Sequence, residues 1–442
     1  MGGILRHYGA AFVERYPQTP PGVQRVLARL AACRTAALGG HVTEGCHCGD
    51  VRYHYHSCGD RHCPACGGSK RAAWLEKRRA ELLPVPYFHV VFTLPHELSA
   101  LVLGNRRTLY TLLLRTAAQT LLDVAADGKH LGARLGALLV LHTWGQQLEH
   151  HPHVHAVVPG GGLALPGPGD ASGEQRWQAC RPNFLLPVKV LGQVFRGKYL
   201  EGLRQAHVTG ALHLGGSTAA LAEPEVFAAW LDGLYRTSWV VYAKKPFGSD
   251  PEQVLKYLAR CTHRVALSNS RLVRVDNDQV TFTYKDYADG CRPKELTLPA
   301  VEFVRRFALH VVPGGLVRIR HYGLLAHRDR GRRLARCRQL LEARAAPPAA
   351  GTASAGPVAE QPKSFSVSVR LVLLMALLLT GTTAAELQTL LADAAAPRCQ
   401  ACGSGRLRTL WQAPRPRSRE VPELRCWPHG ERCAPTGRED SS

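Results

Sequence analysis

The stretch LEHHPHVHAVV, Leu148–Val158, places four histidines within six residues and then continues as an apolar run. On a β-strand the side chains alternate between faces, so His153 and His155 share one face while Val154 points into the core. Pro152 predicts that this strand begins just after it. Two neighbouring imidazoles can hold a divalent cation and leave positions open for substrate and water. We therefore expect a metal-binding strand here, with a polar edge strand as the alternative.

The segment ALLVLHTWGQ, residues 137–146, is typical of a strand and directly precedes the histidines. If the two strands pair antiparallel through the turn QLEHHP, Gln146 falls opposite His153. Gln146 would then complete a His-His-Gln set of metal ligands. His142 and Glu149 are the rival third ligands.

Further strands are expected at YFHVVFTL, residues 87–94, and at QVTFTYKDY, residues 279–287. Helices are expected over residues 105–127 and 251–261. Strands joined both by short turns and by helices indicate an α+β fold. GQVFRGKY, residues 192–199, is a near match to a phosphate-binding loop, but Tyr199 replaces the Ser or Thr that would hold Mg²⁺. We interpret it as part of a basic amphipathic helix and expect no nucleotide cofactor.

The helix PEQVLKYLARC carries a candidate nucleophile. At about 100° per residue, Tyr257 lies off the apolar stripe and shares its side with Arg260 and Arg264. Arginines favour an ionised phenol and are the side chains that phosphate prefers. A tyrosine can attack a phosphodiester and conserve the bond as a phosphotyrosine ester. We expect Tyr257 to be catalytic, with Arg260 and Arg264 steadying the phosphate; a boundary tyrosine used only for packing is the alternative.

Fourteen cysteines without a recognisable export signal favour metal binding over disulfides. Soft thiolates at C-x-x-C spacing select tetrahedral zinc. The first expected zinc site combines Cys46, Cys48, Cys63 and Cys66, with Cys58, His62 and Cys33 as alternative ligands. The second expected site combines Cys399, Cys402, Cys426 and Cys433, with His429 nearby.

The 442-residue chain carries 56 Lys and Arg against 34 Asp and Glu, a net charge of +22. Such an excess favours a partner with a phosphate backbone. The apolar run LVLLMALLLT, residues 371–380, is too short to span a bilayer, so we expect a buried helix and no membrane role. The N-terminus has no secretory signal, and we expect a bacterial cytoplasmic protein associated with the nucleoid.

Six motifs together resemble one known family: CGDRHCPAC, VVFTLPHEL, LHTWGQQLEHHPHVHAVVPGGGL, VVYAKKPF, YLARCTHRVALSNSRL and VRIRHYGLLAHRDRGRRL. Over about residues 30 to 340 the chain resembles the rolling-circle transposases of insertion sequence family 91, in the HUH endonuclease superfamily. The resemblance implies an HUH-type antiparallel sheet with flanking helices. It also implies a metal-dependent nuclease that nicks one strand at the element's ends and becomes joined to the 5′ phosphate.

Carried over residue by residue, the HUH histidines match His153 and His155, and the nucleophile matches Tyr257. Paired-tyrosine members of the family have a second tyrosine four residues after the first, where this chain has Cys261. The family also includes relatives with a single tyrosine. The implied metal is Mg²⁺ or Mn²⁺, and two imidazoles favour Mn²⁺. The implied partners are single-stranded and duplex DNA at the element's ends.

We expect four regions: an N-terminal zinc-binding, DNA-binding module (1–80), the HUH nuclease domain (81–342), a linker (343–364), and a C-terminal helical segment with a possible zinc ribbon (365–442). Two alternative functions remain open at this point. One is an HUH replication initiator or relaxase, and the other is an inactive zinc-ribbon DNA-binding remnant.

Overall fold

The computed structural model describes residues 1–45, 48–66, 74–166, 175–247, 253–254, 256–257, 266–345, 399, 401–402, 407–414, 421 and 423–424. They belong to two compact units, which we describe separately. The first unit comprises Met1–Cys33, Ser57–Ala346 and Val421–Arg432; the second comprises Arg34–His56, Pro347–Glu420 and Cys433–Ser442. The N-terminal 80 residues, expected as one module, are thus divided between the two units.

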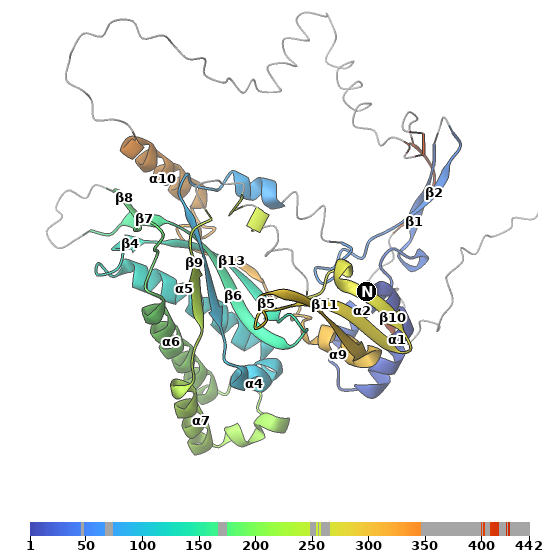
Figure 1. Cartoon of the computed structure of the whole chain (residues 1–442), viewed down its shortest axis with the longest axis horizontal. Helices are drawn as coiled ribbons and strands as arrows, with labels where there is room; N and C mark the ends of the chain where they lie inside the picture. Colours follow the sequence, from blue (N-terminus) through green and yellow to red (C-terminus); the bar gives the residue numbers. More distant parts are fainter. Residues whose placement is uncertain are drawn as a thin grey trace, which may run out of the picture. The chain divides into compact units, whose positions relative to one another are not determined.

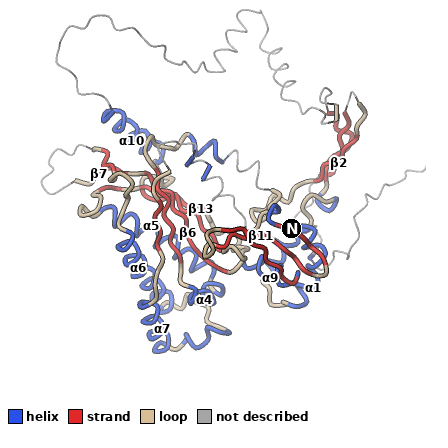
Figure 2. The backbone as a smooth tube through the Cα atoms, viewed as in Figure 1, coloured by secondary structure: helices blue, strands red, loops and turns tan. Residues whose placement is uncertain are grey.

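The first unit contains both helices, blue in Figure 2, and strands, red, and it has runs of consecutive strands as expected for an α+β fold. Its helices are α1 (Gly2–Arg15), α2 (Pro21–Ala31), α4 (Ser99–Gly104), α5 (Arg106–Ala126), α6 (Val188–Val208), α7 (Pro224–Arg236), α9 (Ala300–Leu309) and α10 (Arg330–Ala345). Its strands are β3 (Tyr87–Thr93), β4 (Ala133–Arg134), β5 (Gly136–Trp144), β6 (His150–Pro159), β7 (Gly161–Ala164), β8 (Trp177–Ala179), β9 (Val241–Lys244), β10 (Leu272–Asp276), β11 (Gln279–Asp286), β12 (Arg292–Pro299) and β13 (Ile319–Gly323).

The central sheet has five strands in the order β13-β5-β6-β3-β9, and every neighbouring pair is antiparallel. β6 lies in the middle, between β5 and β3 (Figure 1). The expected α+β fold with an antiparallel sheet and flanking helices is confirmed. The strands expected at residues 87–94 and 279–287 are β3 and β11, and the helix expected at 105–127 is α5.

One face of this sheet packs against helices to form the main hydrophobic core. Val154, Ala156 and Val158 of β6 are fully shielded from solvent and pack in one cluster with side chains of α5 and α6. Burying each of the two valine side chains stabilises the fold by about 1.5–3 kcal/mol. His153 and His155 face the other side of the sheet and are only half-buried, whereas Val157, further along the same side, is buried in a second apolar cluster. The period-two pattern thus separates the main core from a face that carries both the histidines and a smaller apolar cluster.

The segment that resembles a phosphate-binding loop forms the middle of α6, which confirms the helical interpretation. Phe195 and Tyr199 are completely buried there, and Tyr199 packs against Trp239. Burial raises the pKa of Tyr199 well above its usual range. Tyr199 is therefore a core residue.

Two smaller sheets complete the first unit. The sheet β10-β11-β12 is covered by α9, with Phe282 against Phe303, and α1 packs on α9. Strands β4, β7 and β8 form the other small sheet. In the second unit, β1 (Gly40–Gly45) pairs on one side with β2 (Val51–Tyr55) and on the other with β14 (Leu407–Ala413).

Among the described residues, no helix combines the length and apolar character needed to cross a membrane. The apolar run at residues 371–380, expected as a buried helix, lies outside the described residues, as does most of the expected linker at 343–364.

Acid should destabilise this fold through its buried histidines. Burial lowers the pKa of His310 to about 4 and that of His150 to about 3, so the folded chain keeps both rings neutral. The unfolded chain takes up these protons near pH 6.5, and stability is therefore lost as the pH falls below that value. We expect the free energy of unfolding to fall by roughly 1 kcal/mol per pH unit for each such histidine between about pH 6 and pH 4.

His310→Gln isolates one of these contributions, because glutamine keeps a donor for the Leu148 carbonyl and cannot titrate. Urea unfolding at pH 7, 6 and 5 should show a shallower pH dependence for this variant. His96→Gln, at a side chain 90% exposed, is the matched control and should follow the parent chain. If the free energy of unfolding changed equally with pH in all three proteins, His310 would not contribute to the pH dependence.

Candidate metal and tyrosine site

The pairing of β5 with β6 brings three histidines together. His142 of β5 lies directly opposite His153 of β6, and Val140 lies opposite His155. One ligand atom from each of the three imidazoles lies within 4.8 Å of the others. His142 is buried and stacks on Trp144, with ring centroids 4.5 Å apart, which restricts its ring orientation. The rival third ligand, His142, is therefore the one that the register places at the site.

The expected position of Gln146 opposite His153 is wrong. The turn closes earlier than expected, with the Gly145 amide donating to the Glu149 carbonyl, so β6 begins at His150. Pro152 lies inside the strand, where the β5–β6 register shifts, a place that tolerates its missing donor. Gln146 sits in the turn and contacts Tyr287.

Glu149 is also kept from the histidines. It is exposed, and its carboxylate accepts a hydrogen bond from the Gln147 amide at 2.9 Å. Glu149 therefore caps its own turn. Gln146 and Glu149, the two alternatives to His142, both make their contacts at the tip of the hairpin.

The ring nitrogens of the histidines are oriented as metal ligands. His153 Nδ1 lies 2.7 Å from the His151 carbonyl oxygen, which can only accept, so Nδ1 carries the hydrogen and Nε2 presents a lone pair. His153 Nε2 faces His155 Nε2 at 3.1 Å. A cation about 2.1 Å from each nitrogen fits between them at roughly a right angle. The donor set thus fits a divalent ion, with the remaining positions left for oxygen ligands.

Tyr257 reaches this cluster from a separate helical segment. Its hydroxyl oxygen lies 3.2 Å from His155 Nδ1 and 2.5 Å from His89 Nε2. Val254 is buried in the same apolar cluster against which Tyr257 packs, and Phe247 stacks on the Tyr257 ring at 4.6 Å between centroids. The phenol is therefore held over the polar face of the central sheet.

His89 is a site residue that the sequence analysis missed. It projects from β3 on the same face as His153 and His155, and its Nε2 lies 2.7 Å from His155 Nδ1. Burial, with a smaller contribution from Lys244 on the neighbouring strand, lowers the pKa of His89 to about 4. A neutral imidazole can accept a hydrogen bond from the phenol. The available signal was a lone histidine inside the apolar run YFHVVFTL.

Three other predicted features cannot be located at the site. Arg260, Arg264 and Cys261 lie outside the described residues. Tyr257 is thus the one expected catalytic side chain whose surroundings the structure describes.

A first thiol cluster forms in the first unit from Cys33, Cys58, Cys63 and Cys66. The sulfur of Cys33 lies 3.4 Å from that of Cys66 and 3.6 Å from that of Cys63. These separations are far beyond a disulfide and close to the edge of about 3.8 Å expected for four thiolates around zinc. Contacts from Cys58 and Cys63 lower the pKa of the Cys33 thiol, whereas contact with Cys33 raises the pKa of both partners.

The grouping differs from the expected one. Cys48 does not join Cys63 and Cys66; its sulfur lies 3.4 Å from that of Cys399, and Cys402 completes this second cluster. The reason is that β1–β2 belongs to the second unit, whereas the C-x-x-C at Cys63 belongs to the first. Cys46, Cys426 and Cys433 lie outside the described residues.

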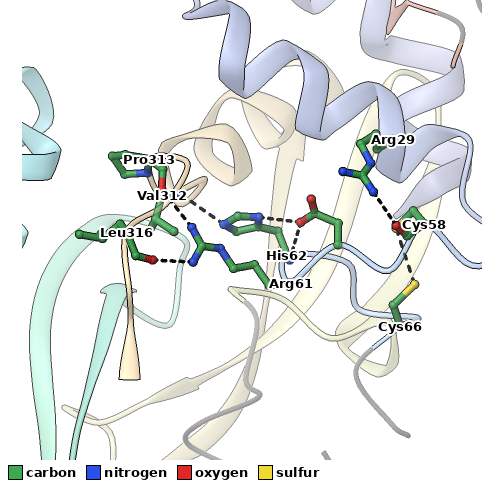
Figure 3. A network of polar contacts seen from close by, with 9 residues as sticks. Arg29, Cys58, Arg61, His62, Cys66, Val312, Pro313 and Leu316 are labelled. Carbon is green, nitrogen blue, oxygen red and sulfur yellow. Dashed lines mark hydrogen bonds and ion pairs between the residues drawn. The ribbon is translucent and has the colours of Figure 1, made fainter. Parts of the chain in front are cut away.

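His62, which the sequence offered as an alternative zinc ligand, uses both ring nitrogens in hydrogen bonds. Its Nδ1 donates to Asp60 at 2.8 Å and its Nε2 accepts from the Val312 amide at 3.2 Å (Figure 3). Burial lowers the pKa of His62, which suits a neutral ring with one donor and one acceptor nitrogen. Beside it, Arg61 donates to the carbonyls of Leu316 and Pro313. His62 and Arg61 therefore join the first thiol cluster to the segment that leads into β13.

Two protein families match parts of this chain. A family described as "Putative transposase" matches residues 136–333, which include β5, β6 and Tyr257, and a "Transposase zinc-binding domain" matches residues 4–94. The chain is 49% identical over 338 residues to a putative transposase, y4qJ, of Sinorhizobium fredii (strain NBRC 101917 / NGR234), covering 76% of this chain and 83% of that protein. It is 30% identical over 320 residues to the transposase for insertion sequence element IS801 of Pseudomonas savastanoi pv. phaseolicola, covering 71% and 73%.

The chain belongs to the insertion sequence 91 family of transposases. The resemblance read from its motifs is confirmed. No solved structure matches the transposase.

If the three histidines bind a divalent cation, Mn²⁺ should stabilise the transposase. At a concentration of about 100 Kd the free energy of unfolding should rise by about 2.7 kcal/mol, and EDTA should remove the gain. His142→Ala and His153→Ala should abolish the effect, because each removes one ligand. Thermal unfolding with and without Mn²⁺ measures it.

Gln146→Ala is the control for this experiment, since Gln146 contacts Tyr287 rather than the histidines. It should keep the full Mn²⁺ response. A response lost in Gln146→Ala but retained in His142→Ala would restore the His-His-Gln set.

Proposed function

We propose that the transposase cuts one DNA strand by attack of Tyr257 on a phosphodiester next to the His142–His153–His155 cluster. The observation that carries the proposal is the position of the Tyr257 hydroxyl, 3.2 Å from His155 Nδ1, while His155 Nε2 faces His153. A nucleophile and a set of cation ligands on one side of one sheet are the parts that a strand-cleaving tyrosine nuclease needs.

A divalent cation bound to the three imidazoles would polarise the scissile phosphate and stabilise the departing oxygen. Nitrogen ligands suit Mn²⁺ better than Mg²⁺, which prefers oxygen ligands. The neighbouring backbone supports the donor set, because the His151 carbonyl fixes the tautomer of His153.

In the proposed step the Tyr257 oxygen forms a bond to phosphorus and the bond from phosphorus to the 3′ oxygen breaks. The product is a 5′-phosphotyrosine ester, and the 3′ oxygen leaves as a hydroxyl after gaining a proton. The phenol must lose its own proton, and His89 Nε2 at 2.5 Å is its nearest hydrogen-bond acceptor in the described part of the chain. The ester keeps the energy of the broken bond, so rejoining needs no nucleotide cofactor.

The substrate is proposed to be single-stranded DNA at the ends of the mobile element, with duplex DNA bound beside it. The net charge of +22 supports binding to a phosphate backbone. The family supports the wider reaction, which is rolling-circle transposition. Arg260 and Arg264 remain proposed phosphate contacts.

Tyr257→Phe should abolish covalent protein–DNA adducts, because it removes only the attacking oxygen. Single-stranded oligonucleotides that carry the element's ends, incubated with Mn²⁺ and resolved on denaturing gels, measure the adducts. Binding of the same oligonucleotide should change by less than about twofold, since the ring remains. Tyr287→Phe, at a tyrosine 67% exposed, should form adducts at the parent rate.

Undiminished adducts in Tyr257→Phe would show that another residue is the nucleophile. Adducts unaffected by EDTA would contradict the role of the cation. Adduct peptides mapped by mass spectrometry identify the linked residue directly.

His89→Phe should slow adduct formation by about 100-fold, the lower range for loss of a proton acceptor in the transition state. The substitution keeps a ring of similar size in β3 but removes the acceptor for the phenol. DNA affinity should stay constant while the cleavage rate falls. Equal losses of affinity and rate would indicate instead that His89 only supports the fold.

A further inference from the structure

A second zinc site can be assigned within the second unit, where the turn between β1 and β2 meets the C-x-x-C that precedes β14. Cys48 lies in the turn of the β1–β2 hairpin. The amides of Cys48 and Gly49 both donate to the Gly45 carbonyl, and the Gly45 amide donates to the Asp50 carbonyl at 2.9 Å. Gly49 has a positive φ of 65°, a backbone conformation that glycine adopts without strain. The hairpin thus fixes the direction of the Cys48 thiol.

Strand β14 carries the other thiols to this turn. It pairs antiparallel with β1, from Gly40 opposite Ala413 to Gly45 opposite Leu407. Glu44 and Arg408 form an ion pair at 2.7 Å across the same pair of strands. Because Leu407 follows soon after Cys402, this register returns the C-x-x-C at Cys399 to the hairpin turn.

The three sulfurs are placed as ligands and not as a disulfide. The sulfurs of Cys48 and Cys399 are 3.4 Å apart, and the sulfurs of Cys48, Cys399 and Cys402 all lie within 4.8 Å of one another. A disulfide would bring two of them to about 2.05 Å. The separation instead matches two thiolates bound to one zinc ion at about 2.3 Å each.

The surroundings favour thiolate ligands over oxygen ligands. The nearby Asp50 carboxylate is paired with Arg52 at 2.5 Å. Gly45 borders the sulfurs so closely that a Cβ there would lie 2.8 Å from the Cys399 sulfur and 2.9 Å from the Cys48 sulfur. The sulfur atoms of Cys48 and Cys399 therefore fill the space beside Gly45, and a side chain at position 45 would push them away.

We propose that Cys48, Cys399 and Cys402 bind a second zinc ion, separate from the one fitted by Cys33, Cys58, Cys63 and Cys66. The three thiolates leave one position of a tetrahedral ion for a further donor. The thiols give up their protons on binding. The ion joins residues 351 positions apart in the sequence and locks the C-terminal strand onto the N-terminal hairpin. This inference does not depend on the proposed nuclease chemistry.

Zinc content tests the assignment in the full-length chain. The zinc-to-protein ratio, measured by elemental analysis after gel filtration, should fall by one in the double variant Cys399→Ser/Cys402→Ser. It should fall by one separately in Cys63→Ser/Cys66→Ser, and by two in the combined variant. Cys291→Ser, at an exposed thiol outside both clusters, should leave the ratio unchanged. An unchanged ratio in Cys399→Ser/Cys402→Ser would overturn the proposal.

Thiol alkylation of the unmodified protein provides a second test that needs no variant to fold. Cys48, Cys402 and Cys291 are all exposed, so without a metal they should react alike. With zinc bound, mass spectrometry should find Cys48 and Cys402 protected by more than tenfold relative to Cys291, and a chelator should release both at the same rate. Equal reactivity of all three thiols in the zinc-loaded protein would refute the site.

Discussion

The antiparallel pairing of β5 with β6 is the constraint on which the rest of the site depends. Its register sets His142 opposite His153 and leaves His155 one pair further along the same face. A slip of β6 by one residue against β5 would turn His153 and His155 to the opposite side, into the cluster formed with α5 and α6, and would separate them from His142. Such a slip would be costly because it would move Val154 and Ala156, which are fully buried, out of the core. The hydrophobic core therefore specifies the geometry of the polar face, although no core residue touches a substrate.

That polar face is itself completed by apolar contacts. Tyr257 belongs to a helical segment whose Val254 is buried, and its ring packs against Phe247 and beside His89. The contacts of the ring with Phe247 and His89 place the hydroxyl beside the imidazoles of His89 and His155. Positioning by packing keeps the Tyr257 hydroxyl on an element separate from the strands that carry the histidine cluster.

Local patterns in the sequence predicted strands β3, β5, β6 and β11, the long helix α5 and the shared face of His153 and His155, because alternation and periodicity depend on neighbouring residues alone. The residue opposite His153 depends on the register of the hairpin, and a bulge near Trp144 together with the early turn at Gly145 makes it His142 instead of Gln146. The thiol groups were mispaired for a similar reason. Cys48 is close in sequence to Cys63, but β14 draws it toward Cys399, and no short-range pattern indicates which distant strand closes a three-stranded sheet. His89 was missed because a single histidine in an apolar run does not indicate a site by itself. Only the pairing of β3 with β6 places it next to His155.

The contact between His62 and Val312 has a consequence for how the transposase responds to oxidants. Val312 is buried, and its amide has the His62 ring as its partner, immediately before the segment that leads to the edge strand β13. Oxidation of the Cys33 cluster would eject its metal and release the loop that holds His62 in place. The buried Val312 amide would then lack a hydrogen-bond acceptor, in the segment that leads to β13, the strand that pairs with β5. Redox damage at the cysteines would therefore weaken the central sheet from its edge.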